Sequence, residues 1–260
     1  MRTAEQEWRQ FLLHPDPLHH GLRAFFRLLP HDPRCTSCAA PFEGGGSRFA
    51  SALGFVRFDK NPRWCAKCFG VIQRKERGGA EIELTMLFAD VRDSTPLAER
   101  LPPTEFHRVM DRFYESATKA AIDEDALIER FMGDQVVAYF VPGFAGASHA
   151  RKALAAARAT LSATGHGQPG GPWVPVGVGV HTGVAFVGTV GDPGSLVNFT
   201  ALGDNVNLAA RLASEARAGE IVASEATALA AGLPDAEGER RTISVKGKSE
   251  PVAVRVLSAA

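Results

Sequence analysis

The sequence lacks any long uncharged hydrophobic run and any excess of charge of one sign. Lys and Arg together number 29 and Asp and Glu together number 29, so the formal net charge is zero. A balanced charge argues against a global attraction to nucleic acid or to an anionic membrane surface. No stretch approaches the ~18 consecutive apolar residues that a membrane span requires. We therefore expect no nucleic-acid partner and no integral membrane segment.

Cysteine is also scarce, and its arrangement restricts the chemistry it can perform. The N-terminus shows no basic segment followed by a clean apolar run, so no secretory signal is evident and a cytoplasmic location is expected. The four cysteines form two CxxC pairs, Cys35 with Cys38 and Cys65 with Cys68, separated by 26 residues. In a reducing compartment such pairs favour thiolate metal ligands over disulfides. The pattern predicts a structural Zn²⁺ site, with an iron–sulfur cluster as the alternative.

Composition divides the chain into an N-terminal region, residues 1–78, and a larger domain, residues 79–260. Apolar residues recur at helical spacing between residues 18 and 29, which predicts a short amphipathic helix. Residues 34–69 show no helical periodicity, and residues 73–79 form a polar, glycine-ended stretch that is typical of a linker. We therefore expect a small helical and zinc-ribbon-like region before the larger domain.

Strands and helices alternate from Glu81 onward. The pattern predicts a long helix that begins with Thr95 as its N-cap and Pro96 as its first residue, because a missing N–H does no harm there. The other elements expected are a strand over 82–88, a hairpin over 126–131 and 136–141, a helix over 149–161, strands over 174–180 and 184–187 around a turn at 181–183, a helix over 205–216, and strands over 243–245 and 252–257. This order predicts an α+β fold with helices packed on a mixed sheet.

Two carboxylates occupy positions that suit a metal–phosphate site. Asp90 ends the first apolar strand, and Asp134 lies in the bend of the hairpin. Ser94 and Thr95 belong to the turn that opens the next helix, where N–H groups and the helix dipole favour phosphate. If the two strand ends are neighbours, the carboxylates can share Mg²⁺. The alternative is that both residues are ordinary turn or cap residues.

Four segments together carry a family resemblance. In order, they are the sequences FADVRDST at 88–95, RFMGD at 130–134, VGVHTG at 178–183 and LGDNVNLAARL at 202–212. This set, over residues 82–257, resembles the class III nucleotidyl cyclase catalytic domain. The resemblance implies a ferredoxin-like mixed sheet with helices, a homodimer, and an enzyme that cyclises a nucleoside triphosphate with release of pyrophosphate.

The resemblance also implies roles for individual residues. Asp90, Asp134 and the carbonyl of Val91 would hold two Mg²⁺ or Mn²⁺ ions per active site. The partner chain would supply Asn207 to orient the ribose and Arg211 to stabilise charge on the α-phosphate in the transition state.

The nucleotide-reading positions by the same resemblance are Arg130 and Thr200 for the base and Lys246 for the triphosphate. Thr200 suits adenine, because a hydroxyl both donates and accepts hydrogen bonds. Arg130 departs from the lysine common in adenylate cyclases, and the two cations are not equivalent. Asp93 stands where the family usually has glycine. We expect ATP as substrate, with cyclic CMP, UMP or GMP synthesis, or a catalytically silent nucleotide-binding dimeric regulatory domain, as alternatives.

Overall fold

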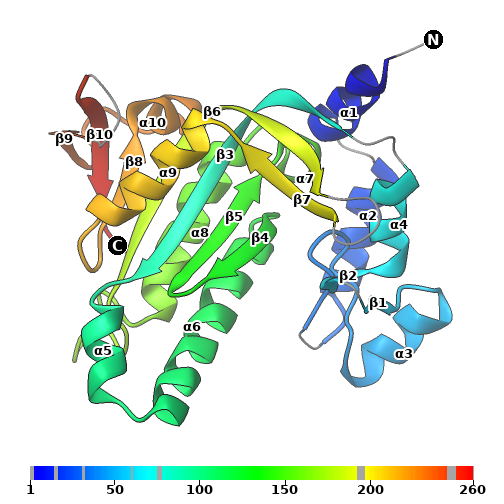
Figure 1. Cartoon of the computed structure of the whole chain (residues 1–260), viewed down its shortest axis with the longest axis horizontal. Helices are drawn as coiled ribbons and strands as arrows, with labels where there is room; N and C mark the ends of the chain where they lie inside the picture. The colour runs from blue at the N-terminus through cyan, green and yellow to red at the C-terminus, as the bar shows by residue number, and fades with distance from the viewer. Residues whose placement is uncertain are drawn as a thin grey trace. The chain divides into compact units, whose positions relative to one another are not determined.

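The structure is a computed structural model, and it describes residues 3–14, 17–30, 33–59, 61–74, 78–191, 197–244 and 250–259. The chain folds as two compact units (Figure 1). Unit 1 contains Met1–Ala80 together with Val187–Thr200, and unit 2 contains Glu81–Phe186 together with Ala201–Ala260. In the described residues, no helix has the length and hydropathy required to cross a membrane.

Unit 1 is more helical than the sequence indicated. Its elements are α1 (Ala4–Leu13), α2 (Pro17–Arg27), α3 (Gly44–Ala52), β1 (Arg57–Phe58), β2 (Asn61–Cys65) and α4 (Ala66–Arg74). The expectations that residues 34–69 lack helices and that the linker begins at residue 73 were therefore wrong. The helices α3 and α4 have nine residues each. So short a helix gives little periodic signal.

Unit 2 is built on a mixed sheet with the strand order β4-β5-β3-β6-β8-β10-β9, and β7 pairs with β6 outside this path. The hairpin predicted from the sequence is confirmed as β4 and β5, which pair antiparallel. The strand bounds are β3 Gly79–Val91, β4 Leu127–Met132, β5 Gln135–Phe140, β6 Val176–Gly191, β7 Val197–Leu202, β8 Ile221–Ser224, β9 Glu239–Ile243 and β10 Val252–Leu257. This mixed α+β architecture agrees with the expected fold class.

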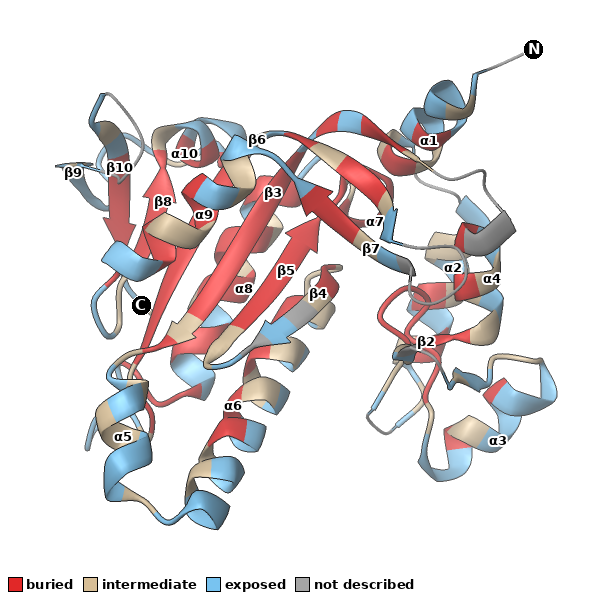
Figure 2. Cartoon of the chain, viewed as in Figure 1, coloured by how far each residue is buried: buried red, intermediate tan, exposed pale blue. Residues whose placement is uncertain are grey.

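Helices cover the two faces of this sheet unequally. The main core joins alternate residues of β3, β5 and β6 to α6 (Pro103–Asp123) and α8 (His149–Ala163). On the other face, α9 (Asp204–Glu215) packs its Leu208 and Leu212 against β8 and β10. Figure 1 shows α6 and α8 on one side of the strands and α9 on the other, and Figure 2 shows how fully the central strands are buried. The remaining helices of unit 2 are α5 (Ser94–Arg100), α7 (Pro142–Ala145) and α10 (Glu225–Ala231).

Two predicted elements differ in the structure. The helix expected from Thr95 onward is two helices, because α5 ends at Arg100 and α6 begins at Pro103 after the N-cap Pro102. A proline pair disfavours helical backbone before it, and this breaks the run. The N-cap of α5 is Asp93 instead of Thr95. The turn expected at 181–183 is absent, since β6 continues through these residues as one strand.

Candidate active site

The end of β3 and the β4–β5 hairpin form one local structure that contains Asp90 and Asp134. Asp90 lies opposite Gln135 in the antiparallel register of β3 with β5. Gly133, at φ +60°, and Asp134 form the two-residue loop between the paired residues Met132 and Gln135. The backbone N–H of Val91 donates to the carbonyl of Asp134 over 3.0 Å. The two carboxylate-bearing residues are therefore fixed next to each other by backbone pairing.

Side chains from two helices support Asp134. The hydroxyl of Ser94, the first residue of α5, donates to Asp134 Oδ2. The hydroxyl of Tyr114 on α6 donates to the carbonyl of Gly133, and its ring stacks on Phe131 at 4.6 Å between centroids. Burial raises the pKa of Tyr114, and the nearby charge of Asp134 adds to this effect. The loop that carries Asp134 is thus held from both α5 and α6.

Asp90 is surrounded by polar groups on the face of the sheet opposite the main core. Its Oδ2 pairs with Arg92 at 2.5 Å and accepts from Gln135 Nε2 at 3.4 Å. Burial raises the pKa of Asp90, Arg92 opposes this shift, and the negative charge of Asp134 reinforces it. A carboxylate that is partly desolvated beside another carboxylate gains from a divalent cation, which both residues can bind. The oxygen donors present fit Mg²⁺ or Mn²⁺.

Backbone conformation at Asp93 explains why this position favours glycine. Asp93 has φ +56° and ψ +34°, the left-handed region, and its side chain makes no capping hydrogen bond to α5. Most side chains avoid this region, and Asp tolerates it better than most. The turn therefore has a backbone conformation that glycine adopts readily, and the side chain of Asp93 adds a carboxylate at its surface.

Helix α9 carries Asn207 and Arg211 one turn apart, so both side chains project from one side of the helix. Asn207 is exposed and Arg211 is partly buried. Within the described part of the chain, no hydrogen bond or ion pair joins either side chain to Asp90 or Asp134. Within one chain, Asp90 and Asp134 therefore form one part of the predicted site, which we call the carboxylate half. Asn207 and Arg211 on α9 form a second part that is not bonded to the first.

The structure describes some, but not all, of the other residues that were predicted to bind the nucleotide. Thr95 is exposed in the first turn of α5. Thr200 is a buried residue of β7, with 4% of its surface exposed. Arg130 lies in β4, but its side chain is outside the described residues, as is the whole of Lys246.

Three residues around the carboxylates were not singled out from the sequence. Arg92 stands two positions after Asp90, which is the spacing that puts strand residues on one face. Gln135 is the first residue of β5, and a two-residue hairpin loop would have placed it opposite Asp90. Tyr114 is remote in the sequence, and no local pattern identifies its contact with Gly133.

The four cysteines of unit 1 do come together. Their sulfur atoms all lie within 4.8 Å of one another, and the Sγ atoms of Cys38 and Cys65 are 3.8 Å apart. A tetrahedral zinc site with Zn–S bonds of about 2.3 Å requires sulfur separations of about 3.8 Å. Backbone N–H groups of Cys65 and Cys68 donate to the sulfurs of Cys35 and Cys65 at 3.2 and 3.4 Å. The donor set and spacing fit a tetrahedral metal ion.

The fold of unit 2, with its carboxylate-bearing hairpin and the helix with Asn and Arg, is of the kind found in catalytic domains that cyclise nucleotides. The family described as "Adenylate and Guanylate cyclase catalytic domain" matches residues 80–257. The match covers more than half of the chain, so the chain belongs to this family.

Individual relatives of the chain include bacterial adenylate cyclases. The chain is 28% identical over 198 residues to the adenylate cyclase of Anabaena cylindrica, and the match covers 72% of this chain and 39% of that protein. It is 34% identical over 135 residues to adenylate cyclase 1 of Rhizobium meliloti, covering 50% of this chain and 20% of the relative. The chain thus matches well under half the length of these relatives.

Solved structures give the same picture. The crystal structure of the guanylyl cyclase Cya2 matches with a TM-score of 0.63 and 28% identity, covering 70% of this chain and all of that one. The adenylyl cyclase CyaB from P. aeruginosa matches with a TM-score of 0.58 and 29% identity, covering 68% and 95%.

Proposed function

We propose that this chain converts ATP to 3′,5′-cyclic AMP and pyrophosphate as a homodimer. The observation that carries this proposal is the pairing of Asp90 and Asp134 at adjoining backbone positions, inside a domain of the cyclase family. The 3′-oxygen of the ribose attacks the α-phosphorus, and the bond from that phosphorus to the bridging oxygen of the β-phosphate breaks. Pyrophosphate leaves with the bond electrons, and the 3′-hydroxyl loses its proton to solvent.

The residues of one carboxylate half would bind and orient the triphosphate. Asp90, Asp134 and the Val91 carbonyl would hold two Mg²⁺ or Mn²⁺ ions, which when bound favour the ionised 3′-oxygen and offset the phosphate charge. Ser94 orients the Asp134 carboxylate, and Gln135 and Arg92 orient that of Asp90. The guanidinium of Arg92 forms an ion pair with Asp90 Oδ2, and a metal ion that binds this oxygen would displace it.

The second half would come from another copy of the chain. Among the described residues, no hydrogen bond or ion pair joins Asn207 or Arg211 to the carboxylates of Asp90 and Asp134 in the same chain. The two side chains project from one face of α9. A head-to-tail pair of chains would place the α9 of one opposite the β3 end of the other. Asn207 would then orient the ribose and Arg211 would stabilise charge that grows on the α-phosphate.

The choice of ATP rests on the base-reading residues and on the adenylate cyclase relatives. Thr200 and Arg130 would read the base, and Lys246 would bind the triphosphate. Glu and Cys, typical of guanylate cyclases at the two base positions, are absent. The similarity to Cya2, a guanylyl cyclase, keeps GTP, and with it CTP and UTP, as the second substrate choice to be tested.

Product identification tests the reaction. The pure chain would be incubated with each of the four triphosphates and Mg²⁺ or Mn²⁺, and the products identified by mass spectrometry. We expect cyclic AMP and pyrophosphate, with Asp90→Asn inactive and Asp123→Asn unaffected. Asp123 is a matched control because it is an exposed carboxylate of the same unit, paired with Lys119 at 2.9 Å. Nucleotide binding without turnover by the wild-type chain would instead support a silent regulatory domain.

A mixing experiment tests the shared site. Dimers of an Asp90→Ala chain with an Arg211→Ala chain contain one composite site with all its residues and one with neither half intact. We expect activity to return on mixing two inactive variants. A confirmed heterodimer without activity would contradict the arrangement.

We also propose that Cys35, Cys38, Cys65 and Cys68 bind one structural Zn²⁺. Three of these thiols are fully buried, and a buried cluster of thiolates needs a cation to offset its charge. Metal analysis of the purified chain should give one zinc per chain, and Cys65→Ser should lose it. Iron with visible absorbance would identify a cluster instead, and no metal in a soluble, folded preparation would refute the site.

A further inference from the structure

The α9-facing side of β6 contains one large side chain in a row of glycines. Alternate residues of a strand share a face, so residues 177, 179, 181 and 183 form one row. Three of them are glycine, and the fourth is His181. A Cβ at Gly179 would lie 2.2 Å from Ala213 N and 2.7 Å from Ala209 O. The backbone of α9 therefore rests directly on the backbone of β6, at a distance that only glycine permits.

His181 makes a polar contact from this row to the first turn of α9. Its Nε2 lies 2.9 Å from Asn205 Oδ1. The amide nitrogen of Asn205 donates to the carbonyl of Val184 at 2.8 Å. Since the amide nitrogen is used there, Oδ1 faces the imidazole and accepts from Nε2–H. Asn205 is thus bound to β6 through both ends of its amide, two residues before Asn207.

The other imidazole nitrogen is bound within the protein as well. His181 Nδ1 lies 2.8 Å from Ser224 Oγ, at the N-cap of α10. With the proton on Nε2, Nδ1 accepts from the serine hydroxyl. The residue His181 is 5% exposed, so its buried contact to Ser224 is not exchanged readily for water. The ring is held in one orientation and one tautomer.

A continuous set of buried hydroxyls extends this contact through the sheet. Ser224 Oγ lies 3.1 Å from Thr227 Oγ1, which accepts from Thr182 Oγ1 at 3.1 Å. Thr182 Oγ1 lies 2.8 Å from Thr85 Oγ1, and Thr85 Oγ1 lies 2.8 Å from His149 Nδ1 at the start of α8. His181 is the end of this set that reaches α9, and His149 is the opposite end.

We propose that His181 is a positioning residue for the reaction: it fixes the first turn of α9, through Asn205, so that Asn207 and Arg211 meet the nucleotide in register. This inference rests on the proposed cyclase function. The glycine row sets the depth of α9 on the sheet, and a sliding helix would still satisfy that contact. The bond from His181 to Asn205 fixes the position of the helix along the strand. A displacement of about 1 Å costs about 100-fold in rate when a group acts in the transition state.

Two substitutions separate the contacts of the ring. His181→Gln places an amide nitrogen near the position of Nε2 and keeps a donor to Asn205, while His181→Asn places polar atoms near Nδ1 and keeps the contact to Ser224. We expect His181→Asn to lower kcat about 100-fold with little change in KM, and His181→Gln to retain much more activity. Equal losses in the two variants, or a greater loss in His181→Gln, would overturn the proposal.

His149→Gln is the matched control, because it also removes a hydrogen bond from a buried histidine of the same polar set. It should keep kcat. Gly183→Ala should disrupt the same contact by a different means. A Cβ at this position would lie 2.8 Å from Asn205 Cγ and 2.9 Å from His181 Nε2. It should lower kcat in the way that His181→Asn does.

Mixed dimers show which half of the site is affected. A His181→Asn chain paired with an Asp90→Ala chain retains one site with both halves intact, and it should recover activity. The same chain paired with an Arg211→Ala chain has a defective α9 in each site and should not recover. Recovery in both pairings, or in neither, would contradict a role confined to α9.

Hydrogen exchange makes the inference independent of turnover. His181→Asn should increase exchange of the amides at the start of α9 while those of α8 stay protected, and His181→Gln should not. If the wild-type chain forms no cyclic nucleotide, the proposed function fails, yet this measurement still decides whether His181 fixes α9. Unchanged protection of α9 in His181→Asn would overturn the inference.

Discussion

Asp93 adopts a left-handed backbone conformation that the turn between β3 and α5 requires. Its left-handed backbone lets the chain turn from the end of β3 at Val91 into α5 at Ser94 with only two residues between them. Glycine adopts this conformation freely, whereas in alanine the Cβ lies too close to the following carbonyl oxygen.

We expect Asp93→Gly to be at least as stable as the wild type and Asp93→Ala to be about 1 kcal/mol less stable than Asp93→Gly. Urea denaturation of the three proteins checks this expectation. If the alanine variant is as stable as the glycine variant, the left-handed turn is absent in solution.

His166 gives the molecule a dependence on pH that is separate from catalysis. Its Nε2 accepts the backbone N–H of Val176 at 3.0 Å, and burial lowers the pKa of the imidazole below its ordinary value near 6.5. The unfolded chain therefore binds the proton first as the pH falls. The free energy of unfolding is expected to decrease on acidification from about pH 6.5 toward the depressed pKa.

His166→Gln should make this decrease shallower by less than one proton per molecule, because a glutamine carbonyl can accept the same N–H without titrating. Urea midpoints between pH 7 and pH 5 measure the difference. Equal slopes in the two proteins would show that His166 is not the group responsible. His149, whose pKa burial also lowers, contributes a slope that both proteins share.

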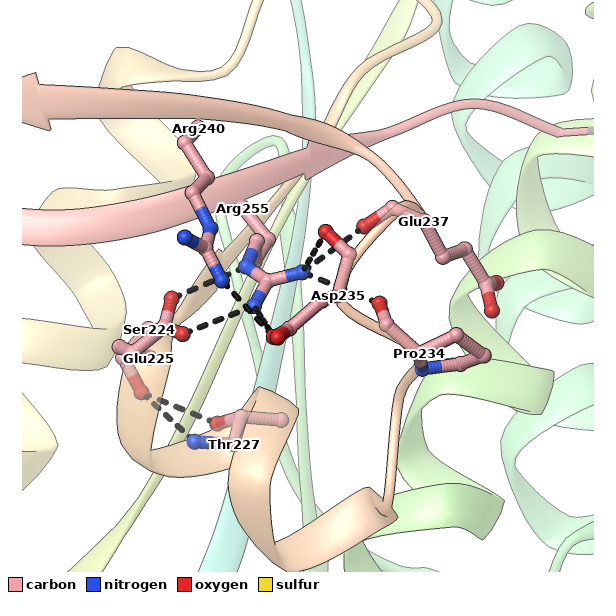
Figure 3. A network of polar contacts seen from close by, with 8 residues as sticks. All are labelled: Ser224, Glu225, Thr227, Pro234, Asp235, Glu237, Arg240 and Arg255. Atoms are coloured by element: carbon pink, nitrogen blue, oxygen red, sulfur yellow. Dashed lines mark hydrogen bonds and ion pairs between the residues drawn. The ribbon is translucent and has the colours of Figure 1, made fainter.

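At the scale of elements, the loop after α10 is fastened to β10 by one buried arginine. Arg255 pairs with Glu225 at 2.9 Å and Asp235 at 3.3 Å, and it donates to the carbonyls of Pro234, Asp235 and Glu237 (Figure 3). Its side chain is 2% exposed. The planar guanidinium donates to several acceptors of the loop at once.

Arg255→Met should lower the thermal midpoint by several degrees, because it keeps the apolar stem and removes the hydrogen bonds and ion pairs of the buried guanidinium. Arg240→Met is the control, since Arg240 pairs with the same Asp235 from a side chain that is 60% exposed. Differential scanning calorimetry of the two variants measures the contrast. A midpoint for Arg255→Met equal to that of the control would contradict the role of the network.

Elements with a strong periodic pattern could be predicted from the sequence, and those whose character depends on distant residues could not. The hairpin, α8 and α9 were anticipated because apolar residues repeat along them. The turn expected at residues 181–183 was wrong because Gly183 signals a turn locally, whereas the structure uses its missing Cβ for the approach of Asn205. Likewise, the contacts of His181 join residues up to 43 positions apart, which no local pattern reveals.

At the scale of the molecule, the two units differ in what stabilises them. Unit 2 has an extensive apolar core between its sheet and two helices. The core of unit 1 around Phe26 and Ala50 includes three of the four cysteines. Arg23 donates to the carbonyls of Thr36 and Ser37, which lie between the cysteines of the first pair, so the order of α2 is coupled to that of the proposed metal site.

Removal of the metal by a chelator should therefore unfold unit 1 and leave unit 2 folded. The three tryptophans report on this, because Trp8 and Trp64 lie in unit 1 and Trp173 lies in unit 2. In a Trp173→Phe chain, chelation should red-shift the emission, and zinc should restore it. In a chain with Trp8 and Trp64 both replaced by Phe, emission should not change. A shift in the second chain alone would reverse the assignment.

Unit 1 joins segments of the chain that are far apart in the sequence. A change in composition near residue 78 suggested one division, but Val187–Thr200 also groups with unit 1. Phe199 stacks on Trp8 at 6.3 Å and meets Trp64 edge to face at 6.4 Å. Since these aromatic contacts join segments far apart in the chain, composition alone gives no sign of them.

This interleaving has a practical consequence for anyone who wishes to produce the catalytic part alone. A chain shortened to begin at residue 79 would keep Phe199 and discard both tryptophans that cover it. In the truncated protein the ring of Phe199 would be exposed to solvent, and we expect non-specific aggregation during purification. Replacing Phe199 with a hydrophilic residue in the shortened chain is the natural remedy, and sedimentation of the two versions would show whether the uncovered ring is the cause.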